Sequence, residues 1–243
     1  KAAQAKRAKT IHVAMPKFSQ SFTNEALVSI VEGALLTNYS FDQLKGDTRK
    51  ASPVLCEQLH LSGVDSSFKK TLDRLIAIAE AVYFARDLVN GNADEVTPAH
   101  LAKIALSMSK KIKTTVLDHK KLSSEGMGLL LAVGRGAVDA PRLICSSYQG
   151  NPKSKEHIVL VGKGVTFDTG GLSLKTTENM LTMKCDMAGA ATVLAVVKLA
   201  AELDLKVNVT AVAPTAENAI GSKSYKLGDV YHACNGKSVE ILN

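Results

Sequence analysis

The sequence predicts an α/β fold in which helices flank a mixed, mainly parallel sheet. Apolar runs typical of buried strands alternate with longer stretches whose apolar residues recur at helical spacing. The clearest unit has a strand in residues 156–162, a helix in 188–203 and a second strand in 206–214. This order predicts a βαβ unit, for which a right-handed crossover is strongly preferred.

The strongest helical pattern lies in residues 67–90, where a broad apolar face ends at an Asn-Gly-Asn sequence. Before it we expect strands at residues 10–16 and 52–59, with a helix at 23–41 between them. We place the domain boundary at the long helix. Residues 1–66 are predicted to be the C-terminal part of an N-terminal α/β domain, and residues 67–90 a linker helix. Residues 91–243 are predicted to be the N-terminal portion of a larger domain.

The larger domain opens with a helix that Thr97 caps and Pro98 begins, both residue types favoured at those positions. A strand, a helix and a strand are then expected at residues 113–118, 126–137 and 141–148. After the βαβ unit, the Asn235-Gly236 dipeptide predicts a hairpin with a type I′ turn, because both residue types tolerate a positive φ.

Composition favours a soluble, cytoplasmic protein. The 243 residues are 46% apolar, and no segment has the roughly 18 uninterrupted apolar residues of a membrane helix. The basic N-terminus is not followed by the apolar region of a signal peptide. The four cysteines form no Cys-x-x-Cys pair, which suits a reducing compartment and argues against a disulfide framework.

The formal charge of +7 raises the question of nucleic-acid binding. Aromatic residues are 5% of the chain, Trp is absent, and no aromatic interleaves with the basic runs as a stacking surface requires. Solvated surface charge is the favoured explanation, and binding to a phosphate backbone stays open. The Gly-rich segments at residues 134–139 and 162–164 match neither phosphate-loop pattern, and His-Glu-x-x-His and Gly-x-Ser-x-Gly are absent.

Residues 161–189 carry four charges at bends or helix starts: Lys163, Asp168, Lys175 and Asp186. Taken singly, Asp186 can be a helix N-cap, Asp168 a turn residue before two glycines, and the lysines exposed charges. Taken together, they suggest a site, because open α/β sheets bind ligands at the carboxyl ends of their strands. We interpret the other two charges, Glu178 and Lys184, as ordinary exposed residues.

Two carboxylates beside lysines suggest a centre for divalent cations. Carboxylate oxygens can bridge two such ions, which together activate a water molecule. A lysine can join them only as a neutral amine, and burial beside a dication lowers its pKa from about 10.4. Lys175, further out, could remain charged and stabilise an oxyanion. Two aspartates and one lysine are too few for two metals, so this interpretation requires further carboxylates.

The stretch resembles the catalytic core of the leucyl aminopeptidase family, the hexameric two-metal cytosol aminopeptidases. The spacing of the family pattern VGKG-[IV]-TFD-[ST]-GG-[IL]-S-[IL]-K, ten residues, D-M-GGAAT is intact here. Further matches flank it, including ARDLVN, GMGLLLAVGRG and YKLGDV. The resemblance covers residues 67–243 well, and residues 1–66 look like the end of the family's N-terminal domain.

The resemblance implies that Asp168 bridges two Zn²⁺ or Mn²⁺ ions, with Mg²⁺ or Co²⁺ as alternatives. Lys163 and Asp186 would complete the tighter site, which also receives the α-amine of a peptide or dipeptide substrate. Lys175 would hydrogen-bond the scissile carbonyl, and Met183 would line an apolar pocket that suits leucine. Met183 could equally be a plain core residue. A homo-hexamer is also implied.

This sequence departs from the family pattern at Ala188, which replaces a glycine, and at Cys185, where a small residue is common. The family hairpin continues into T-D-A-E-G-R, which supplies further metal ligands and an Arg that positions bicarbonate. Asn243 is the last residue here, so we expect a partial chain with weak or no activity by itself. Two other functions stay open: a non-catalytic, DNA-binding member of the family, and a nucleotide-binding α/β domain.

Overall fold

The computed structural model describes residues 7–14, 20–47 and 54–242. The chain divides into two compact units, Lys1–Tyr83 and Phe84–Asn243. The division falls within the long helix α3 (Lys69–Asn90), which the sequence predicted at this position.

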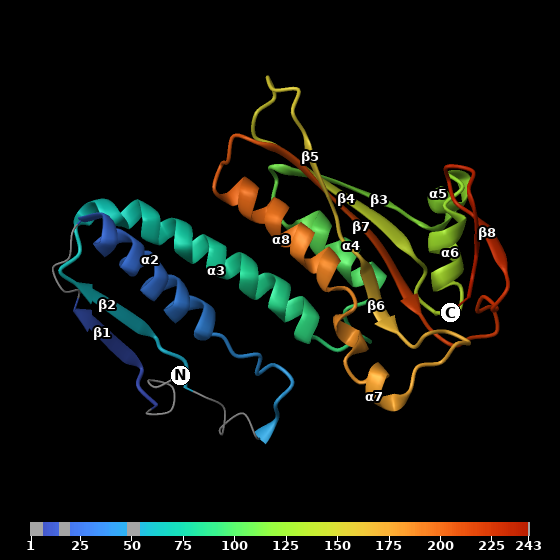
Figure 1. Ribbon diagram of the computed structural model, residues 1–243, viewed down its shortest axis with the longest axis horizontal. Helices are drawn as coiled ribbons and strands as arrows, with labels where there is room; N and C mark the ends of the chain where they lie inside the picture. Colours follow the sequence, from blue (N-terminus) through green and yellow to red (C-terminus); the bar gives the residue numbers. More distant parts are fainter. Residues whose placement is uncertain (1–6, 15–19, 48–53, 243) are drawn as a thin grey trace. The chain divides into compact units, whose positions relative to one another are not determined.

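The described residues of the first unit form a two-stranded parallel sheet, one complete helix and the first part of α3 (Figure 1). Strand β1 (Thr10–Ala14) pairs with β2 (Gln58–Ser62), and helix α2 (Gln20–Thr37) lies between them in sequence. A short 3-10 turn, η2 (Ser66–Phe68), precedes α3. The buried core is small and comes from α2, η2 and α3, through Leu27, Val31, Phe68 and Leu75.

The strand expected at residues 52–59 begins later than predicted, at Gln58. Residues 52 and 53 lie outside the described part of the chain. At Cys56 the side chain of Asn38 replaces strand pairing: its Oδ1 accepts from the Cys56 amide at 2.7 Å, and its Nδ2 donates to the Cys56 carbonyl at 2.8 Å. The ladder of β2 begins two residues after these bonds, which Asn38 makes from 18 positions away.

The second unit is built on a mixed sheet in which the long strand β7 (Asn208–Asn218) is central. One neighbour, β4 (Arg142–Gln149), is antiparallel to β7 and carries β3 (Ile112–Leu117), also antiparallel. On its other side β7 pairs in parallel with β5 (Ile158–Val161) and β6 (Gly164–Asp168). The predicted α/β class with a mixed sheet is confirmed.

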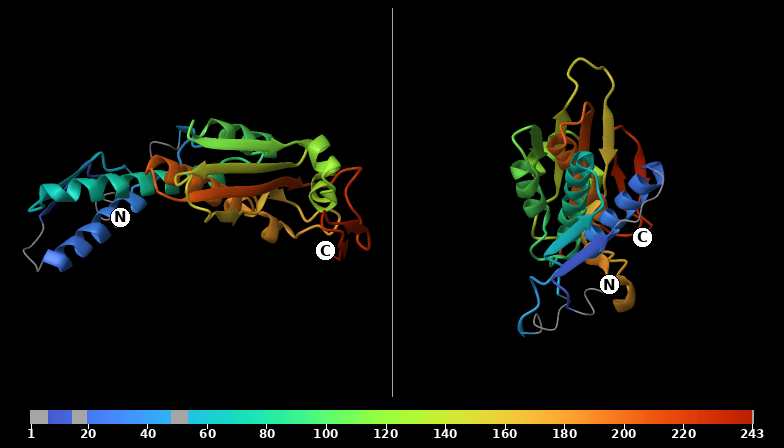
Figure 2. Two further views of the ribbon diagram at one scale, coloured as in Figure 1. Left: turned by 90° about the horizontal axis from the view of Figure 1, so that it is seen from above. Right: turned by 90° about the vertical axis from the view of Figure 1, so that its left-hand side faces the viewer.

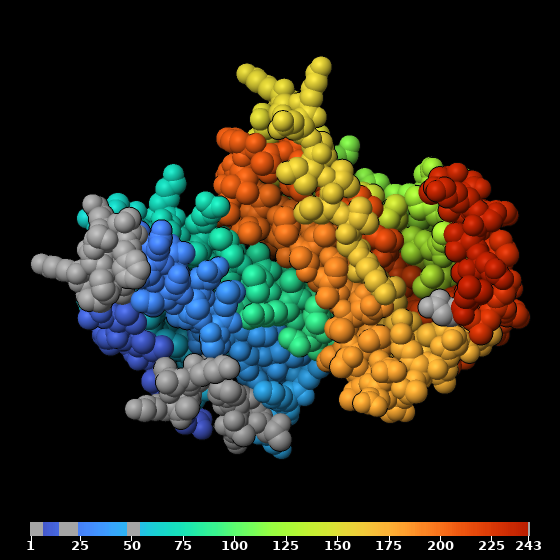
Figure 3. Space-filling view, in the orientation of Figure 1, coloured from blue at the N-terminus to red at the C-terminus, as the bar shows by residue number. Residues whose placement is uncertain are grey.

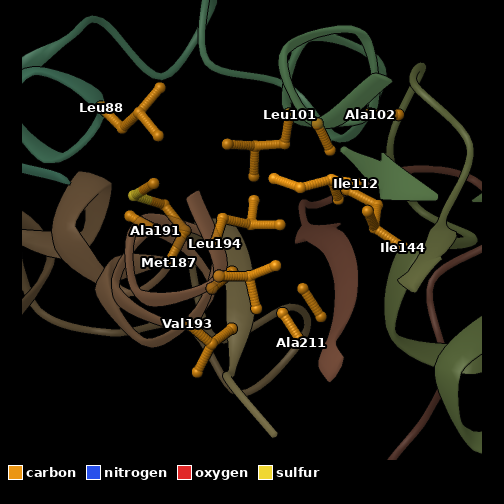
Figure 4. Packing of buried hydrophobic residues seen from close by; sticks show 14 of the residues in the cluster. Leu88, Leu101, Ala102, Ile112, Ile144, Met187, Ala191, Val193, Leu194 and Ala211 are labelled. Carbon is orange, nitrogen blue, oxygen red and sulfur yellow. The ribbon is translucent and has the colours of Figure 1, made fainter. Parts of the chain in front are cut away.

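Two helices pack on this sheet and form the main core, α4 (Pro98–Ser107) and α8 (Ala188–Glu202). Leu101 of α4 and Leu194 of α8 point toward one another, with Ile144 of β4 to one side (Figure 4). Thr97 caps α4 as predicted, accepting from the His100 amide at 3.3 Å. Shorter helices complete the unit: α5 (His119–Ser124), α6 (Gly128–Gly134), α7 (Thr177–Met180) and the 3-10 turn η3 (Met183–Cys185).

The apolar run at residues 156–162 differs from the prediction of a strand covered on both faces. It forms β5, which lies at the end of the sheet order, and its Val161 is 71% exposed. The connection that precedes it, residues 150–157, projects away from the sheet (Figure 2). The strand direction then continues past a break at residues 162–163 into β6, so the predicted strand is the first of two segments.

The C-terminal hairpin pairs β8 (Val230–His232) with β9 (Ser238–Glu240) in antiparallel register. Its predicted type I′ turn is wrong. Among the described residues, the non-glycine residues with positive φ are Arg7 and Asp204, so Asn235 is not one of them. The amide of Gly236 instead donates to the carbonyl of Ala233 at 2.9 Å, with Gly236 itself at φ +83°.

The stretch Thr177–Glu202 is long and apolar enough, by length and composition, to cross a membrane. Its main part, α8, is the central core helix of the second unit, with Ala190, Leu194 and Val197 buried against the sheet. Of its apolar window, 33% is buried, so packing inside the unit accounts for part of its apolar character.

Candidate metal centre

A close backbone contact joins the break between β5 and β6 to the first turn of α8. The carbonyl of Lys163 accepts a hydrogen bond from the amide of Ala190 at 2.8 Å. A Cβ atom on Gly162 would lie 2.3 Å from the carbonyl oxygen of Gly189, and one on Gly189 would lie 2.8 Å from the amide nitrogen of Lys163. Glycine is required at both positions because any side chain would push the two segments apart.

This contact places Lys163 beside Asp186. The Nζ of Lys163 lies 2.9 Å from Oδ2 of Asp186. That oxygen is buried and accepts no hydrogen bond from the described part of the chain, so the contact with Lys163 is an ion pair without hydrogen-bond geometry. The N-cap interpretation of Asp186 is wrong, because α8 begins at Ala188 and Met187 occupies the cap position.

Asp168 ends β6 and is held on both carboxylate oxygens. Its Oδ1 accepts from the amide of Gly170 at 2.9 Å and from Nδ2 of Asn218 at 2.7 Å. Its Oδ2 lies 3.2 Å from Nζ of Lys175. Gly170 has φ +86°, and a Cβ there would lie 2.3 Å from the carbonyl of Ser173, so the turn after Asp168 requires glycine. Asp168 is thus both a turn residue and a site candidate.

The charge of Asp168 is favoured by these contacts. Burial by itself would raise the pKa of Asp168, but the hydrogen bonds from Gly170, Asn218 and Lys175, with the positive charge of Lys175, hold the pKa below its usual value. A carboxylate kept ionised in this way is suited to bind a cation.

The two ion pairs lie at the same end of the second unit, because β6, which ends at Asp168, contacts η3, which directly precedes Asp186. The residues from β6 to α8 form a continuous part of the molecular surface (Figure 3). Met183 lies in η3 and is half-buried. Glu178 is exposed as predicted, but Lys184 is not simply exposed, since its Nζ donates to the carbonyl of Asn90 at 2.9 Å.

These residues fit part of a metal centre. The buried, hydrogen-bond-free Oδ2 of Asp186 and the ionised carboxylate of Asp168 are donors that a divalent cation prefers. Within the described ranges, no group of three His, Cys, Asp or Glu side chains gathers closely enough to hold a metal. A lysine that binds a metal as a neutral amine was expected to be buried. The side chain of Lys163 is instead 62% exposed, so the described residues do not bury it.

The glycine-rich segment at residues 162–164 lies between two strands. A phosphate loop instead leads from a strand into a helix N-terminus, where backbone amides meet the phosphate. This placement argues against the nucleotide-binding interpretation of the segment.

Two neighbours of Asp168, namely Asn218 and Tyr225, and a half-buried carboxyl on the same strand, Glu217, were missed by the sequence interpretation. Asn218 contacts Asp168 directly, and the hydroxyl of Tyr225 lies 3.4 Å from Nδ2 of Asn218. Glu217 is half-buried, and burial together with the charges of Asp94 and Asp139 raises its pKa. Asn218 follows Asp168 by 50 positions, and only the pairing of β6 with β7 brings them together.

Comparison with known proteins agrees with the resemblance drawn from the motif. A model of the cytosol aminopeptidase family, catalytic domain, matches residues 83–243. The chain is 46% identical over 247 residues to a probable cytosol aminopeptidase of Protochlamydia amoebophila. The aligned part is 100% of this chain and 50% of that protein. It is 47% identical over 237 residues to a probable cytosol aminopeptidase of Chlamydia abortus, with 96% and 47% covered.

Solved structures show the same fold. The bottromycin maturation enzyme BotP in complex with Mn superposes with a TM-score of 0.84 at 31% identity, over 98% of this chain and 51% of that one. A cytosol aminopeptidase from Coxiella burnetii gives a TM-score of 0.81 at 29% identity, over 95% and 47%. The chain therefore spans about half the length of the curated relatives and of the solved structures it matches.

Proposed function

Because this chain belongs to the cytosol aminopeptidase family, we propose that the protein is a metal-dependent aminopeptidase that removes N-terminal residues from peptides. The observation that carries the proposal is the pair of carboxylates, Asp168 and Asp186, with one buried Asp186 oxygen that accepts no hydrogen bond from the described residues. Burying a charged oxygen is costly unless a cation or donor lies beside it, and here the ammonium of Lys163, at 2.9 Å, occupies the place that we propose for a metal ion.

Asp168, Asp186 and Lys163 are the residues that would hold divalent cations. We propose two ions, Zn²⁺ or Mn²⁺, with Mg²⁺ or Co²⁺ as alternatives, and a bicarbonate in the complete site. When bound, such ions supply Lewis-acid polarisation of a carbonyl and an activated water. The Mn complex of BotP supports divalent-metal use in this fold.

Lys175 is proposed to orient the substrate carbonyl. Its Nζ lies 3.2 Å from Asp168 Oδ2, and its side chain is partly exposed, so the ammonium faces both the carboxylate and solvent. From this place it can donate a hydrogen bond to the scissile carbonyl. The same hydrogen bond strengthens as negative charge develops on that oxygen, which lowers the barrier.

The same residues support the substrate class that we propose. The carboxylates Asp168 and Asp186 favour a free α-amine, and half-buried Met183, in the turn before Asp186, provides apolar surface for a first side chain such as leucine. We further propose a homo-hexamer in the cytoplasm that acts on peptides or dipeptides. These assignments rest on the family and on the residue matches within residues 161–189.

The test is hydrolysis of leucine p-nitroanilide by the protein as its gene encodes it, after loading with Mn²⁺ or Zn²⁺. We expect p-nitroaniline release that a chelator stops and that re-added metal restores. N-acetyl-leucine p-nitroanilide is the matched control substrate, because it lacks the free amine and should not be cleaved.

Lys175→Met is the matched variant. It removes the ammonium while keeping an unbranched side chain, and the loss of one oxyanion donor is expected to lower kcat by about 100- to 1000-fold. Cleavage of the acetylated substrate at a similar rate, or activity indifferent to metal removal, would contradict the proposal.

A further inference from the structure

We propose that Asn218 is a positioning residue for the metal centre. Its side-chain amide holds Oδ1 of Asp168, so that Oδ2 is the oxygen presented to a divalent cation. This inference rests on the proposed function, because it assigns to Asn218 a role in the same centre.

The side chain of Asn218 is held in one orientation. Asn218 ends β7 and is 8% exposed, and its Nδ2 donates to Asp168 Oδ1 at 2.7 Å. An ionised carboxylate only accepts hydrogen bonds, so the amide nitrogen must face Asp168. The hydroxyl of Tyr225, itself buried, lies 3.4 Å from the same nitrogen.

The backbone of Asn218 fixes the turn that follows Asp168. Its carbonyl accepts from the amide of Thr169 at 2.9 Å and from the Thr169 hydroxyl at 2.8 Å. That hydroxyl in turn accepts from the amide of Gly171 at 3.1 Å. Asn218 therefore holds the backbone next to Asp168 through its carbonyl and orients the Asp168 carboxylate through its side-chain amide.

The two oxygens of Asp168 are consequently unequal. Oδ1 accepts two short hydrogen bonds, from Gly170 and Asn218, whereas the described contact of Oδ2 is the ion pair with Lys175 at 3.2 Å. A cation can approach Oδ2 by displacing the partly exposed ammonium of Lys175, but reaching Oδ1 would require breaking two short hydrogen bonds, one of them to the buried Asn218. Partners that orient a ligand in this way commonly raise metal affinity.

The strand offers a matched control in Asn208, at the opposite end of β7. Asn208 is also 8% exposed, and its Nδ2 donates to the carbonyls of Asn151, Ser154 and Glu156. Loss of its amide removes buried hydrogen bonds from the same strand but touches no residue of the metal centre.

The experiment measures the dissociation constant for Mn²⁺ by titration calorimetry on the purified protein as its gene encodes it, and on its Asn218→Ala and Asn208→Ala variants. Asn218→Ala is expected to weaken Mn²⁺ binding by about 10- to 100-fold, as for other outer partners of metal ligands. Asn208→Ala should lower the melting temperature and leave the Mn²⁺ constant within about twofold of wild type, because it lies outside the centre. Asn218→Ser, too short to reach Asp168, should repeat the loss if the alanine variant does not fold.

A second readout needs no metal. In the metal-free protein, the effects of Asn218→Ala and Asp168→Ala on the free energy of unfolding should be non-additive in a double-mutant cycle. The effects of Asn208→Ala and Asp168→Ala should add. Equal Mn²⁺ affinity in wild type and Asn218→Ala overturns the positioning role and leaves the proposed function standing. An equal loss in Asn208→Ala also overturns it. Absence of Mn²⁺ binding by wild type, despite coupling, overturns the metal centre and the positioning role together.

Discussion

The carbonyl of Lys163 accepts a hydrogen bond from the amide of Ala190 at 2.8 Å, which joins the break between β5 and β6 to the first turn of α8. The ion pair of Lys163 with Asp186 depends on this hydrogen bond, because it holds the backbone of Lys163 against the start of α8, next to Asp186. It exists only because Gly162 and Gly189 carry no side chain.

Replacement of Gly189 by Ala should separate these segments. The new Cβ would lie 2.8 Å from the amide nitrogen and 3.1 Å from the carbonyl oxygen of Lys163, both backbone atoms that cannot rotate away. We expect a loss of about 1–3 kcal/mol in the free energy of unfolding, the usual range for overpacking. Urea denaturation followed by circular dichroism measures it.

Gly33→Ala is the control for this substitution. Gly33 lies inside α2, and a Cβ there meets nothing within 4 Å. Alanine is the better helix former, so this variant should gain about 0.5–1 kcal/mol. Equal effects of the two substitutions would show that the contact at Lys163 is unimportant.

Asp186→Asn should weaken divalent-metal binding sharply without unfolding the chain. The buried Oδ2 accepts no hydrogen bond from the described residues, so neutralising it removes a cation ligand and no structural hydrogen bond. Loss of an outer partner costs about 10- to 100-fold in affinity, so we expect a larger increase in the dissociation constant here. Calorimetric titration with Mn²⁺ and Zn²⁺ measures this change.

Asp204→Asn is its control. Asp204 is an exposed carboxylate paired with Lys111 at 2.6 Å, and exposed pairs of this kind contribute little. Metal affinity should not change in this variant, and a comparable loss there would mean that general charge, not a site, attracts the ion.

Glu217→Gln should stabilise the protein at neutral pH. Burial, with the nearby charges of Asp94 and Asp139, raises the pKa of Glu217 in the folded state. Because the folded state favours the protonated form of Glu217, this side chain contributes its full stability below the unfolded pKa of about 4.3. That contribution is lost as the pH rises through the pKa of the folded state. The variant should therefore melt higher than wild type at pH 7, and the difference should vanish near pH 3.5. A melting temperature lower than wild type at pH 7 would refute the electrostatic explanation.

Asp139→Asn should show the opposite sign. Burial opposes ionisation of Asp139, but hydrogen bonds from the Thr97 side chain, Arg142 and the amide of Ala99, together with the charge of Arg142, hold its pKa below the usual value. Its contribution is present above the unfolded pKa of about 3.9 and is lost as pH falls through the folded value. We expect a loss of about 1–2 kcal/mol at pH 7, shrinking below pH 4. Chemical denaturation across pH 3–7 measures it, and a loss that does not vary with pH would contradict the prediction.

Local patterns were enough to predict most elements and the family, and they nominated the residues that we propose for the site. Helical periodicity predicted α3, the Thr97-Pro98 pair predicted the start of α4, and the spacing within residues 161–189 predicted the family. Each of these signals is carried by residues close together in the chain. One error, the start of β2, arose where a distant residue intervened, because Asn38 binds the backbone of Cys56.

By itself, the sequence determined the α/β class and the family, and it singled out Lys163, Asp168, Lys175 and Asp186 as the candidates for the site, because short-range spacing encodes the family pattern. The tertiary structure decided how they pair: Lys163 with Asp186 and Lys175 with Asp168. It also decided that Asn218, 50 positions away, orients one oxygen of Asp168. Strand pairing and backbone contacts at glycines set these relationships, and neither can be read from neighbouring residues alone.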